Sequence, residues 1–174
     1  VQVIAGAQKG TKGVVLALDT KKLRVKVQGV SVQTHFDKKE GSIKGYSGEA
    51  YTDKLTFDFD SKEDVEIAKK DTLATLTRLT DEFKIDPNAI RLYFSGNKGF
   101  HIEVYTTGRY SPEEVKAICF NIAGNLDSFD TSIYNTTRVF RLNNTINLKS
   151  NLYKIELDLE DINLPLESIK QKAK

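Results

Sequence analysis

The stretch Lys54-Leu-Thr-Phe-Asp-Phe-Asp60 indicates the class of fold. Its alternation of apolar and polar residues predicts a strand that buries Phe57 and Phe59 on one face and directs Asp58 and Asp60 to the other. Ser61, a favourable N-cap residue, comes next, and helical spacing of apolar residues predicts an amphipathic helix over 62–84. The expected apolar stripe of that helix consists of Val65, Ala68, Leu73, Leu76, Leu79 and Phe83.

Further elements are expected toward the C-terminus. Ser111-Pro-Glu-Glu114 predicts a second helix, because it supplies an N-cap, a first-turn proline and a capping-box glutamate. From residue 54 the predicted order is strand–helix–strand–strand–helix–strand–strand, which is typical of an α/β (α+β) domain of the ferredoxin-like type. The remaining expected elements are strands over 90–95, 100–105, 137–142 and 153–157, a tight turn over 96–99, and a short helix over 165–171.

The sequence divides into a separate, glycine-rich portion over residues 1–50 and a second portion over 51–174. Strands are expected over 13–18 and 23–28, and a loop over 41–48. The portion holds nine Lys or Arg residues against four Asp or Glu residues. This local excess of positive charge fits either a solvated surface or a basic binding face. His35 is expected to be a structural or surface histidine.

Composition limits the class of protein. The 174 residues are 39% hydrophobic and 29% charged, with a formal net charge of +2, which is typical of a globular domain rather than a disordered chain. No apolar run approaches the roughly 18–20 residues that span a bilayer, and no secretory signal is visible. The single cysteine, Cys119, excludes an internal disulfide framework and a multi-cysteine zinc site. Because the sequence has no methionine, we expect it to be part of a longer protein.

Three groups of polar residues are candidates for chemistry. Two carboxylates on one strand face, Asp58 and Asp60, repel each other, and a hard divalent metal ion is a natural neutralising partner. The turn Ser95-Gly-Asn-Lys-Gly-Phe-His101 offers backbone N–H groups and a lysine to phosphate oxygens. Downstream of Asp130, Arg138-Val-Phe-Arg141 offers guanidinium groups for bidentate phosphate contacts. The alternatives are a solvated strand end, an ordinary glycine turn and two exposed arginines paired with acidic helices.

Together the three groups resemble the motifs of the archaeo-eukaryotic primase superfamily, in particular its PrimPol-like and phage or plasmid members. The first motif is Phe57-Asp-Phe-Asp-Ser61, and the second is the complete Ser95-Gly-Asn-Lys-Gly-Phe-His101. The third comprises Asp130, Ile133-Tyr134 and Arg138-Val-Phe-Arg-Leu142. The resemblance covers roughly residues 51–157 and implies a ferredoxin/RRM-like primase palm.

The resemblance also implies a role for each matching residue. Asp58, Asp60 and Asp130 would be the catalytic residues that ligate two Mg²⁺ or Mn²⁺ ions. The residues that would hold the nucleotide are Ser95, Gly96, Lys98, Gly99, His101, Arg138, Arg141 and Lys149. The implied enzyme is a DNA primase or DNA-directed polymerase that joins an NTP or dNTP to a 3′-hydroxyl on a single-stranded DNA template.

The sequence departs from the family pattern in two places. Only 57 residues precede Asp58, and Lys149 lies further from Arg141 than the corresponding lysine of PrimPol-like members. The resemblance implies partner domains, a helicase or a zinc module, and a cytoplasmic replication site without membrane. The alternative function is a catalytically idle nucleic-acid-binding module of the same fold.

The N-terminal portion has a resemblance of its own. It resembles the KOW-type β segment of RNA-binding proteins in the stretch Val3-Ile-Ala-Gly-Ala-Gln-Lys-Gly-Thr-Lys-Gly-Val-Val15.

Overall fold

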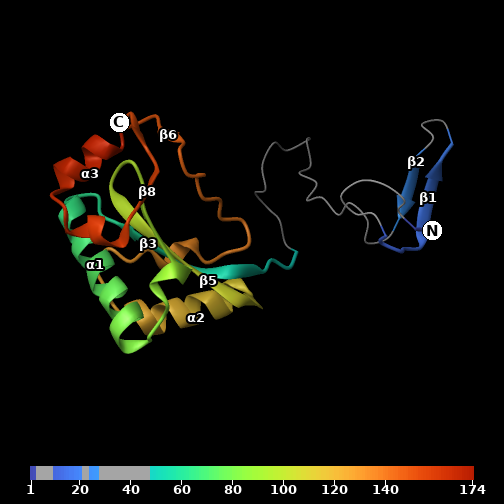
Figure 1. The fold of residues 1–174 in the computed structure, drawn as a ribbon, viewed down its shortest axis with the longest axis horizontal. Coiled ribbons are helices and arrows are strands. Elements are labelled where there is room, and N and C mark those ends of the chain that lie inside the picture. Colours follow the sequence, from blue (N-terminus) through green and yellow to red (C-terminus); the bar gives the residue numbers. More distant parts are fainter. Residues whose placement is uncertain (3–9, 21–23, 28–47) are drawn as a thin grey trace. The chain divides into compact units, whose positions relative to one another are not determined.

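A computed structural model describes residues 1–2, 10–20, 24–27 and 48–174. The chain divides into two compact units, Val1–Ile43 and Lys44–Lys174 (Figure 1). In the first unit, β1 (Val15–Asp19) and β2 (Arg24–Val27) pair antiparallel, which confirms a strand in each of the two predicted places. His35 and the expected loop before Gly48 lie outside the described residues.

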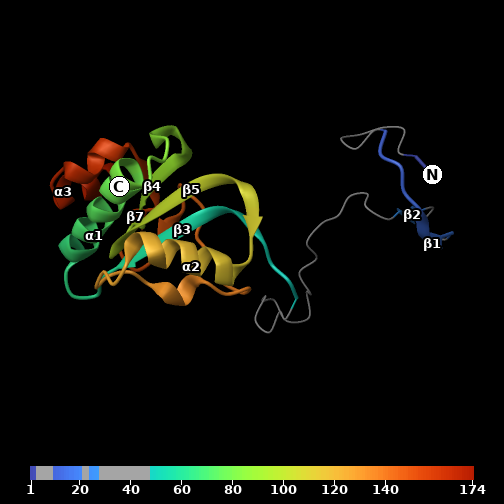
Figure 2. The same cartoon turned by 90° about the horizontal axis from the view of Figure 1, so that it is seen from below.

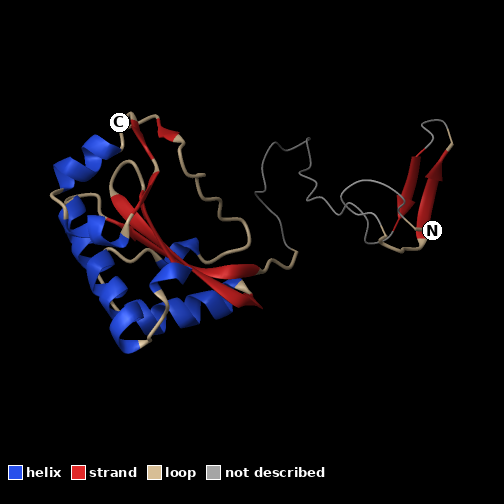
Figure 3. Ribbon diagram, in the orientation of Figure 1, coloured by secondary structure: helices blue, strands red, loops and turns tan. Residues whose placement is uncertain are grey.

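The second unit is an α+β domain with a four-stranded antiparallel sheet (Figure 3). The order of strands is β3 (Thr52–Asp60), β5 (Gly99–Tyr110), β4 (Ile90–Phe94) and β8 (Ile155–Leu157). A separate pair consists of β6 (Ile146–Asn147) and β7 (Leu152–Tyr153). The helices are α1 (Val65–Thr77), α2 (Pro112–Ala123) and α3 (Leu166–Lys172). Short helical turns cover Arg78–Glu82, Pro87–Ala89, Thr131–Ile133 and Leu159–Asn163.

The hydrophobic core lies on one face of this sheet. Phe57 and Phe59 of β3 are fully buried, as the alternation predicts, and Phe100 and Ile102 of β5 lie beside them. Helices α1 and α2 cover this face (Figure 2), and α2 begins with the predicted capping box between Ser111 and Glu114. The opposite face of β3 and β5 bears polar side chains, among them Asp58, His101 and Glu103.

The first helix differs from the prediction at both ends. Its N-cap is Asp64 rather than Ser61, because the Asp64 carboxylate accepts from the Glu66 amide, while Ser61 accepts from the Asp64 amide one turn earlier. Regular α-helix ends at Thr77, and a π-helical turn follows. Leu73 and Phe83 are exposed instead of buried, because α1 directs Ala68, Thr72, Thr75 and Leu76 toward the sheet.

The predicted strand over 137–142 is wrong. This segment has irregular backbone and pairs with no strand among the described residues, and residues 128–130 pair instead with the Asp58–Asp60 end of the β3 edge. The predicted strand over 153–157 is divided into β7 and β8 at Lys154, whose amide donates to the Thr145 carbonyl at 2.9 Å. Residues 138–141 therefore cross the polar face as an irregular segment, which lets both arginines approach the same region.

Candidate functional site

Asp58 lies on the face of the sheet opposite the hydrophobic core, and only 3% of its surface is exposed. Its neighbour across the sheet is His101, whose Nε2 lies 3.4 Å from Asp58 Oδ1. Arg138 Nη2 lies 3.6 Å from Asp58 Oδ2. Asp58 Oδ1 is buried and accepts no hydrogen bond from any described group. Burial, and then the negative charges of Asp60 and Asp130, raise the pKa of Asp58 to about 7.

Asp130 reaches this site because residues 128–130 pair with the edge of β3. The Asp130 amide donates to the Asp58 carbonyl at 2.8 Å, and the Asp60 amide donates to the Ser128 carbonyl at 2.8 Å. The Phe129 ring packs against Phe59, with centroids 5.5 Å apart. One Asp130 carboxylate oxygen accepts from the Ser132 amide, and the other lies 3.7 Å from Arg138 Nη2. The third predicted acid is thus beside the first.

The segment is anchored by a residue that no sequence pattern assigned to the site. Asp71 of α1 is buried, and its carboxylate accepts from the Ser128 amide at 3.0 Å and from the Ser128 hydroxyl at 2.7 Å. An acid on the buried face of a helix was the signal that could have found it, since a buried carboxylate requires a partner. The partner lies 57 positions away in sequence, which no local pattern predicts.

The glycine turn lies at the Asp60 end of β3. Lys98 Nζ forms a 2.8 Å ion pair with Asp60 Oδ2, and the Ser61 amide donates to the Lys98 carbonyl. Ser95 closes the turn, because its hydroxyl accepts from the Gly99 amide at 3.1 Å. Gly99 faces Asp60 across the β3–β5 pair, where a Cβ atom would collide with the Phe59 carbonyl.

Gly96 and His101 are constrained in different ways. Gly96 has a positive φ of 78°, and a Cβ atom there would lie 2.8 Å from the Tyr153 carbonyl oxygen, so the turn requires glycine. His101 is buried against the edge of Phe140, and its Nδ1 has no hydrogen-bond partner among the described groups. Burial, and then the positive charges of Lys154, Arg141 and Arg138, lower the pKa of His101 to about 3. Its imidazole is therefore neutral at physiological pH.

The two arginines converge on the site from different directions. Arg138 lies between Asp58 and Asp130, and its guanidinium is 5.9 Å from the centroid of the Phe140 ring. Arg141 turns toward the glycine turn, where Nη2 donates to the Ser95 carbonyl at 2.5 Å. Lys149 lies in the β6–β7 loop with an exposed side chain, and its ammonium forms no ion pair with any described residue. Among the described contacts, Lys149 therefore has no hydrogen bond or ion pair to another predicted site residue.

Lys154 connects these segments and was also not assigned from the sequence. It is buried at 3% exposure, and its ammonium donates to the Arg141 carbonyl at 3.1 Å while it lies 4.7 Å from the centroid of the Tyr93 ring. Lys154 therefore holds the backbone of Arg141, and Arg141 in turn holds the backbone of Ser95.

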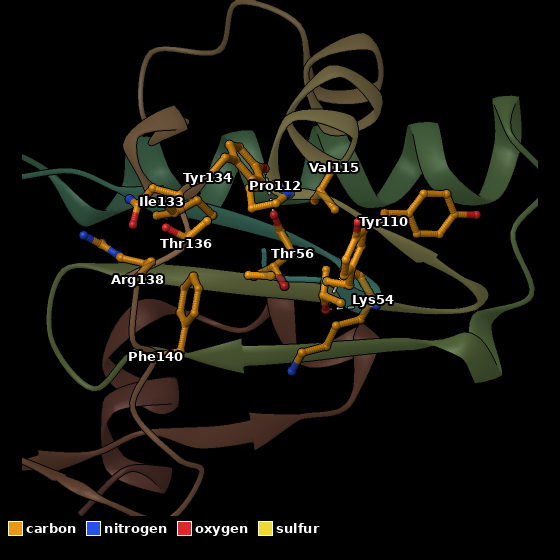
Figure 4. A pocket seen from close by; sticks show the side chains of 14 residues that line it. Lys54, Thr56, Tyr110, Pro112, Val115, Ile133, Tyr134, Thr136, Arg138 and Phe140 are labelled. Carbon is orange, nitrogen blue, oxygen red and sulfur yellow. Dashed lines mark hydrogen bonds between the residues drawn. The ribbon is translucent and has the colours of Figure 1, made fainter. Parts of the chain in front are cut away.

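A pocket of about 230 Å³ lies on the other side of Arg138, toward the start of β3 (Figure 4). We call it the β3 pocket. Figure 4 shows Arg138 and Phe140 at one end and Lys54 and Tyr110 at the other, with Thr56 between them. Its lining residues are Ala50, Tyr51, Thr52, Lys54, Thr56, Tyr110, Pro112, Val115, Ile133, Tyr134, Asn135, Thr136, Arg138 and Phe140.

The donor chemistry of the site fits the divalent metal ions that the resemblance implies. Three carboxylates supply hard oxygen ligands, and the unpartnered Asp58 Oδ1 is a buried acceptor that a cation would satisfy. In this structure the three carboxylates form ion pairs with cationic side chains: Lys98 pairs with Asp60, and Arg138 pairs with Asp58 and Asp130. Within the described ranges, no three His, Cys, Asp or Glu residues gather at metal-binding spacing.

Comparison with known proteins gives one partial match. No family model matches the chain. The chain is similar to the large ribosomal subunit protein uL24 of Bdellovibrio bacteriovorus, with 57% identity over 44 residues. The match covers 25% of this chain and spans about half the length of that relative, 51%. Among the described residues, no helix is long and apolar enough to cross a membrane.

Proposed function

We propose that residues 51–174 are the catalytic core of a template-dependent nucleotidyltransferase, a primase or primase-polymerase. One observation supports this most strongly. The cation Arg138 lies 3.6 Å from the strand acid Asp58 and 3.7 Å from the distant acid Asp130, on the polar face of the sheet. A stable domain gains little from such a cluster, because a buried carboxylate beside two like charges is costly. Substrate chemistry would explain why the charges are kept.

The residues along β3 would have different functions. Lys98 and the turn amides would bind the outer phosphates of an NTP or dNTP at the Asp60 end. Arg138 would contact the phosphate nearer the reacting centre, and neutral His101 would hold Asp58 in place. Bound Mg²⁺ or Mn²⁺ on Asp58, Asp60 and Asp130 would activate the attacking 3′-hydroxyl and stabilise the leaving pyrophosphate. Metal binding would require Lys98 and Arg138 to exchange their carboxylate partners for phosphate.

Asp60→Asn tests this proposal. We expect loss of Mg²⁺- or Mn²⁺-dependent nucleotide incorporation on a primed single-stranded DNA template, with a folded protein, since the substitution removes one metal ligand and keeps the side-chain shape. Asp53→Asn is the matched control, because Asp53 is an exposed acid on the same strand. Full activity in Asp60→Asn would refute the catalytic proposal. Template binding without incorporation by the unmodified chain would favour the idle nucleic-acid-binding module.

A second proposal rests on the match to uL24. We infer that the matched stretch lies in the N-terminal portion and binds RNA of the large ribosomal subunit, because 57% identity over 44 residues is high and residues 1–50 are basic. Co-sedimentation of the chain with large ribosomal subunits at low and high salt measures this. Equal recovery of the chain with and without subunits would contradict it.

A further inference from the structure

The β3 pocket is chemically different from the acidic site that it adjoins. Four aromatic side chains line it, those of Tyr51, Tyr110, Tyr134 and Phe140. Two threonines of β3 and two polar residues after Ile133 supply hydrogen-bonding groups, and none of the described side chains that line the pocket is acidic. Its volume of about 230 Å³ is below the ~300–1,000 Å³ of pockets for drug-sized ligands, so it suits one ring system and not several.

Cations stand at both ends of the β3 pocket. Lys54 Nζ forms a 2.7 Å ion pair with Glu103 at the far end, and Arg138 separates the pocket from Asp58 and Asp130 at the near end. Aromatic walls between two cations match a nucleoside that carries phosphate, since the base stacks on the rings and the phosphate meets the positive charge.

The position of the pocket decides which nucleoside it takes. The residues along β3 run from the pocket at Thr52, Lys54 and Thr56, through Asp58, to Asp60 and its partner Lys98. In phosphoryl transfer the attacking and leaving oxygens lie roughly in line on opposite sides of the phosphorus atom. If the leaving pyrophosphate lies at the Lys98 end, the attacking hydroxyl must approach from the pocket end.

We propose that the β3 pocket binds the 3′-terminal nucleoside of the growing strand, with its base against the aromatic wall and its 3′-hydroxyl directed past Arg138 toward Asp58. This inference rests on the proposed function and adds the subsite for the strand end. Bond formation then joins this 3′-oxygen to the α-phosphorus of the incoming nucleotide, the bond to pyrophosphate breaks, and the hydroxyl proton passes to solvent.

A paired change in protein and primer tests the pocket. Thr136→Trp fills the pocket from a half-buried wall position outside the acidic site, and Thr77→Trp, exposed on α1, is the matched control. The probe is a fluorescent primer–template whose primer ends in a normal or an abasic 3′-nucleotide, measured by anisotropy. Because stacking of one base on aromatic groups is substantial, the abasic end should weaken binding to the unmodified chain roughly tenfold.

We expect Thr136→Trp to weaken binding of the normal primer by a similar factor and to show no further loss with the abasic end. Thr77→Trp should keep the full difference between the two primers. Ala50→Trp, at another lining position of the pocket, provides the same test if Thr136→Trp does not fold. The proposal would be overturned if the abasic end weakened primer binding equally in Thr136→Trp and in the unmodified chain. It would also be overturned if Thr136→Trp removed the effect of a missing base on the incoming nucleotide and not on the primer end.

The two proposals fail differently. The anisotropy measurement requires no turnover, so a chain that never incorporates nucleotides would refute the nucleotidyltransferase proposal independently of the pocket. A chain that incorporates nucleotides but shows equal penalties would refute the pocket alone.

Discussion

Asp58 is a carboxyl group whose environment opposes its charge. Its usual pKa of 3.8 is raised to about 7, first by burial and then by the charges of Asp60 and Asp130. The unfolded chain therefore ionises at Asp58 in a pH range where the folded chain keeps the proton. Between pH 4 and 7 this difference favours the unfolded state progressively, and above pH 7 the penalty is constant.

Asp58→Asn should consequently stabilise the protein at pH 7.5 in the presence of EDTA. The amide has the shape of the protonated acid, and removing the penalty should raise the free energy of unfolding by roughly 1–4 kcal/mol. Urea denaturation at pH 4 and pH 7.5 measures this, and the gain should vanish at pH 4. Asp53→Asn, at an exposed acid on the same strand, is the comparison and should give no gain. A lower stability of Asp58→Asn at pH 7.5 would contradict this account.

The turn between β4 and β5 ends at a glycine that the pairing of the strands itself requires. Gly99 lies within β5 opposite Asp60, and its Cβ would meet the β3 backbone. We therefore expect Gly99→Ala to reduce the free energy of unfolding by roughly 1–3 kcal/mol, because the strands would have to separate. Chemical denaturation without nucleotide measures this. A Gly99→Ala protein that is as stable as the parent but binds nucleotide poorly would instead place the ligand at Gly99.

The irregular segment 138–141 gives its two arginines different tasks. Arg138 lies at the carboxylates, so Arg138→Ala should weaken nucleotide binding with Mg²⁺ about ten- to hundredfold, the worth of a charge-assisted contact. Arg138→Lys should recover only part of that, because the planar fork is lost. Arg141→Ala removes the contact to the Ser95 carbonyl and should cost less. Calorimetric titration of each of the three variants with nucleotide and Mg²⁺ measures these losses of affinity. A larger loss for Arg141→Ala than for Arg138→Ala would show that the roles of the two arginines are the reverse of those proposed.

At the level of the whole molecule, the hydrophobic core residues that the structure describes all lie between Leu55 and Ala173. We therefore expect a fragment of residues 44–174 to fold on its own and to melt cooperatively within a few degrees of the full chain. Calorimetry of the fragment and of the chain measures this. A fragment without a cooperative transition would mean that Val1–Ile43 is required for folding.

Local sequence patterns predicted those parts of the fold that depend on neighbours in the chain. The alternation around Asp58 predicted β3, and the capping box at Ser111 predicted the start of α2. The strand expected over 137–142 failed because a strand needs a free partner edge, which local sequence does not specify. The anchors Asp71 and Lys154 were missed for the same reason, since their partners lie elsewhere in the chain. The motif residues could be named, but not the contacts that bring them together.

Strand β3 lies at the edge of its sheet, and residues 128–130 cover the part of that edge that bears Asp58 and Asp60. An unpaired edge strand exposes N–H and C=O groups that can pair with a strand of another molecule, which promotes aggregation. The backbone bonds that bring Asp130 to Asp58 thus also shield this edge from neighbouring chains. A change that weakens the Asp71–Ser128 hydrogen bonds should therefore reduce solubility as well as disturb the site. Resistance to aggregation and the geometry of the site would depend on the same contacts.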